Sequence, residues 1–193
     1  MAQHCQLTDH VLGLVFDTTA SNTGWKIGTC VLLEKLLCKK LMMLACRHHF
    51  YERILSAVYR AIFGPTSGPD NADFEKFRDL HWKHINTESG FHVLQITNDS
   101  LLRRRDIIEV LKDILDSELP RDDYRECAEV MCLLLGETTA RGMHWFRPGA
   151  ANYAGWMPAV LYPAKMFAFS SWAGYDSSMI RKLNSLCLFN ALF

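Results

Sequence analysis

Two short apolar runs, each followed by turn residues and a helical pattern, constrain the fold of this chain more than any other feature. The first run covers residues 11–16 and ends at Asp17, and the second covers residues 41–45 and ends before a polar cluster. Apolar positions at helical spacing follow each run, in residues 25–39 and 48–63. Strand, helix, strand and helix with short joints form a βαβα unit with parallel strands. The sequence therefore predicts an α/β fold in which two strand ends share one edge of a sheet.

The apolar positions of this unit are expected to face inward. We expect residues 11–16 to form a buried strand, and the two helices to bury one face each. Asn22 or Thr23 is expected to cap the first helix, because a short side-chain oxygen accepts hydrogen bonds from free N–H groups of the first turn. The expected inward positions are Ile27, Val31, Leu32 and Leu36 in the first helix, and Ile54, Leu55, Val58, Ala61 and Ile62 in the second.

The second half of the chain has mainly helical patterns. Gly and Pro residues in 64–69 separate it from the first half. Residues 91–97 fit either an edge strand or a loop, and both alternatives stay open. Pro158 and Pro163 are expected to interrupt or kink the helix that contains them. The predicted helices cover residues 73–84, 99–117, 120–135, 151–170 and 176–190.

Composition excludes few functions. The 193 residues include 21 basic and 21 acidic side chains, so the overall charge gives no sign of nucleic-acid binding. The seven cysteines are irregularly spaced with no signal peptide ahead of them, so we expect free thiols in an intracellular, reducing compartment. No stretch reaches the roughly 18 apolar residues that a membrane span needs, so no membrane partner is expected.

Asp17 is the first candidate for a functional residue. A carboxylate at a strand end suits Mg²⁺, which prefers oxygen ligands. Phosphodiester chemistry usually needs two such ions, bridged by one carboxylate and flanked by others, so Asp17 alone is insufficient. The structural alternative is that Asp17 organises the turn together with Thr18, Thr19 and Ser21.

Cys46 and His49 form a Cys-x-x-His pair after the second strand. Zinc would need two more ligands, and Cys30 and Cys38 are too loosely spaced for a recognised zinc framework. A thiol nucleophile at a helix N-terminus is the other chemical interpretation. The expected role is structural, with a small buried cysteine and a histidine that fixes the strand-to-helix turn.

The remaining basic and aromatic clusters are expected to serve the structure. Acidic residues surround Arg103–Arg105 and Lys112, so this helix is expected to be a solvated face with i,i+4 ion pairs. Trp145, Trp156 and Trp172 are expected in the core.

Together these motifs resemble cut-and-paste DNA transposases of the hAT-like kind. Asp17 followed by Asn22 resembles the second-aspartate region, and Cys46-x-x-His49 resembles the Cys/Asp-x-x-His signature of that family. The resemblance covers about residues 11–70 and, more weakly, residues 143–170. Residues 16–24 and 44–49 also look like stretches in uncharacterised transposon-derived proteins of animals, as do residues 64–69 and 147–150.

The resemblance implies an RNase H-like core in which three acids bind two Mg²⁺ ions and act on DNA in the nucleus. Asp17 would match the middle acid, and residues 73–145 part of a helical insertion. The implied fold class is α/β, with a partial RNase H-like βαβα unit in residues 1–70 and a mostly α-helical, truncated insertion-like region in residues 71–193. Asn22, Cys46 and His49 would be structural parts of the motif.

The chain departs from that pattern at the other two acids. The family's first acid lies on an earlier strand of a meander, and the ten residues before position 11 leave no room for one. The last acid should follow the insertion, but Asp176 is the only acidic residue after position 150. We therefore expect Asp17 to be a vestigial catalytic and metal-binding acid, in a transposase fragment that binds no Mg²⁺ and cannot cut or join DNA by itself.

Two further hypotheses stay open. In the first, the chain is a retained interaction module without enzymatic role, and its helical half binds a protein partner. In the second, it is a small phosphoryl-transfer enzyme, which requires Asp9 or Glu52 to lie within about 4 Å of metal ions shared with Asp17. A fragment should have an unpaired sheet edge and aggregate, whereas a module should be a monomer or a defined oligomer.

Overall fold

The chain divides into two compact units, Met1–Ile54 and Leu55–Phe193. The division lies within helix α3 (Arg47–Phe63), whereas the sequence placed it after residue 70. The computed structural model describes residues 8–65, 72–88, 90–94, 101–149 and 156–192.

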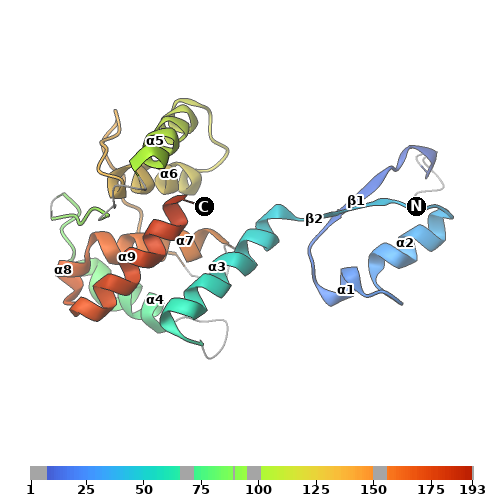
Figure 1. Cartoon of the computed structure of the whole chain (residues 1–193), viewed down its shortest axis with the longest axis horizontal. Coiled ribbons are helices and arrows are strands. Elements are labelled where there is room, and N and C mark those ends of the chain that lie inside the picture. Colours follow the sequence, from blue (N-terminus) through green and yellow to red (C-terminus); the bar gives the residue numbers. More distant parts are fainter. Residues whose placement is uncertain (1–7, 66–71, 89, 95–100, 150–155, 193) are drawn as a thin grey trace. The chain divides into compact units, whose positions relative to one another are not determined.

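The N-terminal unit contains a two-stranded parallel sheet. Strands β1 (Gly13–Phe16) and β2 (Met42–Ala45) pair along their whole length (Figure 1), and a short 3₁₀ helix, η2 (Thr8–His10), precedes them. One hydrogen bond extends the pairing past the strands, because the Cys46 N–H donates to the Phe16 carbonyl at 2.7 Å. The predicted order of strand, helix, strand and helix and the parallel pairing are therefore confirmed.

Two helices, instead of the single helix predicted for residues 25–39, connect the strands. They are α1 (Ala20–Thr23) and α2 (Thr29–Leu37). The chain turns tightly between them, and the Gly28 N–H donates to the Gly24 carbonyl at 2.7 Å. A Cβ on Gly28 would lie 2.5 Å from the backbone nitrogen and oxygen of Gly24, so this turn requires glycine.

The predicted capping of the first long helix is wrong. Asn22 and Thr23 lie within α1, and the N-cap of α2 is Gly28, which makes no side-chain capping hydrogen bond. The tight turn leaves room only for glycine at that position. The Asn22 side chain contacts Asp17 instead.

The apolar side chains of this unit are largely exposed, which corrects the prediction of a buried first strand. Val15 in β1 is 76% exposed, and all four residues of β2 are exposed. Ile27 and Leu36, predicted to face inward, are exposed as well. Parallel sheets usually have both faces covered by helices. The periodicity identified the apolar positions, but within the described part of the N-terminal unit no second layer covers these side chains.

The C-terminal unit is helical in its described residues. Helix α7 packs against α6 and α9, and α5 packs against α6 (Figure 1). Besides the end of α3, its elements are α4 (Ala72–Lys76), the π-helix η3 (Phe77–His81), the 3₁₀ helix η4 (Trp82–His84), α5 (Leu101–Asp116), α6 (Asp122–Leu134), α7 (Trp156–Ala168), α8 (Ser170–Ala173) and α9 (Ser177–Leu192).

The helix predicted for residues 73–84 is divided into α, π and 3₁₀ turns. Phe74 and Phe77 are buried, whereas Leu80 is exposed and His81 is half-buried. The wider π turn changes the residue spacing, and His81 follows Phe77 inward in place of Leu80.

Helix α7 contains Pro163 and is continuous around it. Proline lacks an N–H group, so the carbonyl of Ala159 loses its usual partner four residues later. The side-chain amide of Asn190 on α9 donates to this carbonyl at 3.4 Å. A neighbouring helix thus supplies the missing donor, and the expected interruption at Pro163 does not occur.

Three other helix predictions agree with α5, α6 and α9 to within a few residues. The described part of segment 91–97, Phe91–Leu94, forms no helix or strand, although the Leu94 N–H donates to the Leu134 carbonyl at 2.8 Å. Residues 95–97 and 151–155, which other predictions included, lie outside the described residues.

Two basic side chains of α5, Arg104 and Lys112, pair outside their own helix. Lys112 and Arg104 both reach Glu137, at 3.1 and 3.5 Å. Arg104 also donates to the Leu135 carbonyl at 2.8 Å, next to Gly136, whose positive φ of 79° ends α6. The i,i+4 pairs predicted within α5 are therefore wrong for its described side chains, because Glu137 takes both cations.

The core lies between α6, α7 and α9. Trp145 and Trp156 pack against it as predicted, but Trp172 is 48% exposed, so its predicted core position is wrong. Among the described residues, no helix combines the length and the apolar character that crossing a membrane requires. The most deeply buried side chains of these helices include Val130, Leu134, Met166, Leu183 and Leu186.

Candidate functional site

Asp17 lies directly after β1 and organises the turn that follows. Its Oδ1 atom accepts hydrogen bonds from the Thr19 N–H at 3.0 Å, the Thr19 hydroxyl at 2.5 Å and the Asn22 side-chain amide at 2.8 Å. The Thr19 hydroxyl also contacts the Ser21 hydroxyl at 2.9 Å. Three donors from its own turn therefore converge on one oxygen of this carboxylate.

These donors lower the pKa of Asp17 below its usual 3.8. The side-chain hydrogen bond from Thr19 contributes most, followed by the backbone N–H of Thr19 and the amide of Asn22. His49 adds a smaller electrostatic contribution in the same direction. Asp17 and His49 are therefore close enough to interact, although they come from different strand ends.

Cys46 and His49 lie at the start of α3. The backbone of Cys46 joins both elements, because its N–H donates to Phe16 and its carbonyl accepts from the Phe50 N–H at 3.2 Å. The Nδ1 atom of His49 lies 3.5 Å from a carboxylate oxygen of Glu52, one turn later in the helix. The thiol of Cys46 is half-buried. In these contacts Cys46 acts through its backbone, and His49 acts through its contact with Glu52.

The described surroundings of Asp17 do not fit the two-Mg²⁺ site that the transposase resemblance implies. Such a site needs several oxygen ligands converging on shared ions. Here amide and hydroxyl donors surround Oδ1, and a donor repels a cation that approaches the same oxygen. Among the described residues, no three His, Cys, Asp or Glu side chains are placed to hold a metal ion.

A buried ion pair in the C-terminal unit was missed by the sequence analysis. Glu126 on α6 and Lys165 on α7 meet at 2.7 Å, and each side chain is only 3% exposed. The same two groups hold Phe146, whose N–H donates to Glu126 at 2.7 Å and whose carbonyl accepts from Lys165 at 2.8 Å. One ion pair therefore satisfies both backbone groups of a loop residue and joins the loop to two helices.

Burial shifts both pKa values of this pair toward the neutral forms. Desolvation raises the pKa of Glu126 and lowers the pKa of Lys165, and the attraction between the two groups opposes both shifts. The ammonium of Lys165 also lies 5.4 Å from the ring centre of Trp82. The pair lines a cavity of about 340 Å³ with apolar residues of α7 such as Leu161. The sequence did contain a sign that Lys165 has a buried partner, because it is the only charged residue between positions 148 and 175.

The hydrogen bonds to Asp17 predict how its pKa responds to substitution. Replacing Thr19 by Val removes the largest contribution, so the pKa of Asp17 should rise, and Asn22→Ala should raise it less. Because the folded-state pKa lies below 3.8, the turn is stabilised above pH 3.8 and loses this stabilisation as pH falls through the lowered value. A ¹³C NMR titration of the carboxyl group measures each pKa.

Ser21→Ala is the matched control, since Ser21 contacts Thr19 and not the carboxylate. It should leave the pKa of Asp17 nearly unchanged. A pKa of Asp17 at or above 3.8 in the unmodified chain would contradict the described turn.

The buried pair predicts strong coupling between its two members. Lys165→Met or Glu126→Gln leaves one partner in the core, and losing one member of such a pair costs about 3–5 kcal/mol of unfolding free energy. The double variant removes both groups that desolvation penalises, so its loss should be well below the sum of the single losses. Urea unfolding measures all three variants. Exposed Lys83→Met is the control, and additive losses at Glu126 and Lys165 would disprove the coupling.

Comparisons of this sequence with models of protein families, with curated proteins and with solved structures give no match. The choice of a function therefore depends on the described geometry and on the sequence motifs.

Proposed function

We propose that this chain derives from a hAT-like DNA transposase and that, by itself, it neither cuts nor joins DNA. In this proposal the N-terminal unit is part of an RNase H-like core, and Asp17 occupies the position of the middle acid. The C-terminal unit corresponds to part of the helical insertion. DNA is the partner of the intact family, and the nucleus is where such an enzyme acts.

The arrangement of motifs supports the proposed origin. Asp17 follows β1 and Cys46 follows β2, and the two strands are parallel, so both motifs lie at the same edge of the sheet. His49 lies near enough to influence the pKa of Asp17. A strand pair with the acid and the Cys-x-x-His motif at one edge is the relation that the resemblance implies.

The observation that carries the proposed inactivity is the convergence of three donors on Asp17 Oδ1. Strand transfer with two metal ions needs a carboxylate whose oxygens bridge the ions. An oxygen that accepts three hydrogen bonds from its own turn is committed to that turn. The carboxylate thus has a sufficient structural role without any metal ion.

A nicking assay on supercoiled DNA with Mg²⁺ or Mn²⁺ tests the inactivity. We expect no metal-dependent nicking by the purified full chain. Nicking that is lost in Asp17→Ala and retained in Asp106→Ala would contradict the proposal, because Asp106 is an exposed acid of the C-terminal unit. The proposed origin predicts terminal inverted repeats in the flanking genomic DNA, together with an upstream reading frame that encodes another strand ending in Asp. Flanks without either feature would count against a transposon origin.

A second candidate function is a protein-interaction module with no enzymatic role. Val110 and Ile114 favour it, because they lie one turn apart on α5 and both are exposed. Size-exclusion chromatography with light scattering separates the two candidates. A monomer or a single defined oligomer supports the module, whereas polydisperse aggregates support a transposase fragment with an unpaired sheet edge.

A further inference from the structure

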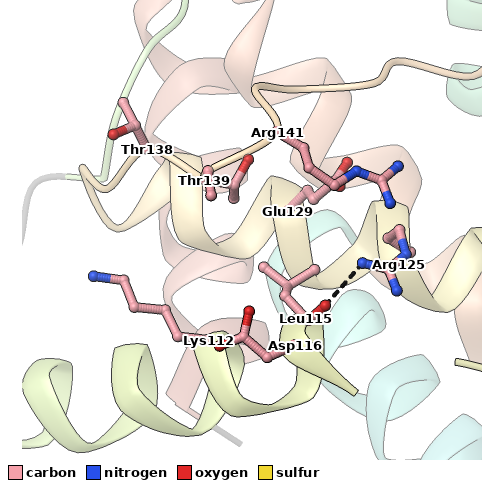
Figure 2. Close-up of a pocket in the computed structure, with 9 residues that line it drawn as sticks. Lys112, Leu115, Asp116, Arg125, Glu129, Thr138, Thr139 and Arg141 are labelled. Atoms are coloured by element: carbon pink, nitrogen blue, oxygen red, sulfur yellow. Dashed lines mark hydrogen bonds between the residues drawn. The ribbon is translucent and has the colours of Figure 1, made fainter. Parts of the chain in front are cut away.

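A cavity of about 380 Å³ lies between α5, α6 and the segment 138–141 of the C-terminal unit. Figure 2 shows its charged side chains, which come from all three elements and face a common space. Its volume is at the lower end of the range of small-molecule pockets, about 300–1,000 Å³. The charged residues that line it are Lys112, Asp116, Arg125, Glu129 and Arg141.

Glu129 is the unusual member of this set. It is only 2% exposed, yet it forms no salt bridge with any described residue. Its one hydrogen bond with a described residue is long, because the His144 N–H lies 3.4 Å from Oε2. Burying a carboxylate without a close cation is unfavourable, so such groups are normally paired. Glu126, one turn earlier in α6, has a lysine at 2.7 Å.

The nearby cations are committed elsewhere, with one exception. Arg125 donates to the carbonyls of Leu115 at 2.9 Å and Ser117 at 3.2 Å, and the first bond is drawn in Figure 2. Lys112 pairs with Glu137 at 3.1 Å. Arg141 is exposed and has no ion pair or hydrogen bond with a described residue.

Four of the charges that line the cavity have no ion pair with a described residue: Glu129 and Arg141, exposed Asp116, and Arg125, which two carbonyls hold. Glu129 is the buried acid among them, and Arg141 is the base that no carbonyl holds. Glu129 lies on α6 and Arg141 on the segment that follows it, and the hydroxyl-bearing Thr138 and Thr139 complete that side of the lining. No salt bridge joins the two charges, so their charged atoms lie more than 4.0 Å apart. A ligand that carries both charges would neutralise both walls, which a simple cation or anion would not do.

We propose that this cavity binds a small zwitterion of the amino-acid class. The ammonium group of the ligand donates to Glu129, and its carboxylate accepts from Arg141. The site lies in the helical unit and does not depend on the proposed role of Asp17, so a transposase fragment or an interaction module would equally possess it.

Amide NMR spectra of the full chain test this site. Each standard L-amino acid is titrated singly, and methylammonium chloride and sodium acetate serve as single-charge probes. At least one amino acid should cause saturable shifts in residues 112–116, 125–129 and 138–141. Its dissociation constant should be about tenfold or more below that of either single-charge probe, since the second charge adds a charge-assisted hydrogen bond.

Variants of the two charges identify the contacts. Glu129→Gln and Arg141→Gln should each weaken binding by about tenfold or more, the loss of one charge-assisted hydrogen bond. Glu109→Gln, an exposed substitution on α5, should leave the affinity within about twofold, as expected of a surface charge. Arg141 is exposed, so its variant keeps the test valid if the Glu129 variant fails to fold.

Three outcomes would overturn the proposal. The first is the absence of saturable shifts with every amino acid at millimolar concentration. The second is binding that persists unchanged in Arg141→Gln and in a folded Glu129→Gln. The third is equal affinity for acetate and for the amino acids, which would show an anion site that does not use Glu129.

Discussion

The parallel pairing of β1 with β2 is the constraint on which the candidate site depends. It places the end of each strand at one edge of the sheet, with Asp17 after one strand and Cys46 after the other. The Cys46 N–H extends the pairing to the Phe16 carbonyl, and α3 begins at the next residue. This fixed edge lets the Thr19 and Asn22 donors gather around Asp17 while His49 approaches from the second strand end.

Three carboxylates show how local surroundings decide what an acid does in this chain. Asp17 is exposed and is satisfied by donors of its own turn. Glu126 is buried and is satisfied by a lysine distant in sequence and by a backbone N–H. Glu129 is buried and has a single, long hydrogen bond with the part of the chain that the structure describes. The first two acids have complete structural roles, whereas the third has no close cation among the described residues and lines a cavity.

Local patterns predicted the elements better than they predicted burial. The strand positions, α3 and most later helices follow from periodicity and from stop signals such as Gly136, because these depend on neighbours in the sequence. Periodicity also suggested that Val15 and Ile27 are buried, but burial requires a second layer that a local pattern cannot provide. The tight turn at Gly28, which separates α1 from α2, and the pairing of Glu126 with Lys165 both depend on close contacts between segments. The spacing of residues in the sequence does not reveal such contacts. At the candidate site, the sequence singled out Asp17 and named Thr19 as a partner in its turn, but it did not predict the hydrogen bond from Asn22.

Paramagnetic line broadening by Mn²⁺ tests most directly whether Asp17 belongs to its turn rather than to a metal site. Mn²⁺ binds where Mg²⁺ binds and broadens amide NMR signals near the ion. The described turn predicts that the amides of Asp17, Thr19 and Asn22 broaden no more than the amide of Asp106, an exposed acid on α5. Strong, saturable broadening confined to these three residues and His49 would contradict it, because it would show that the carboxylate binds a metal ion in spite of its three hydrogen bonds.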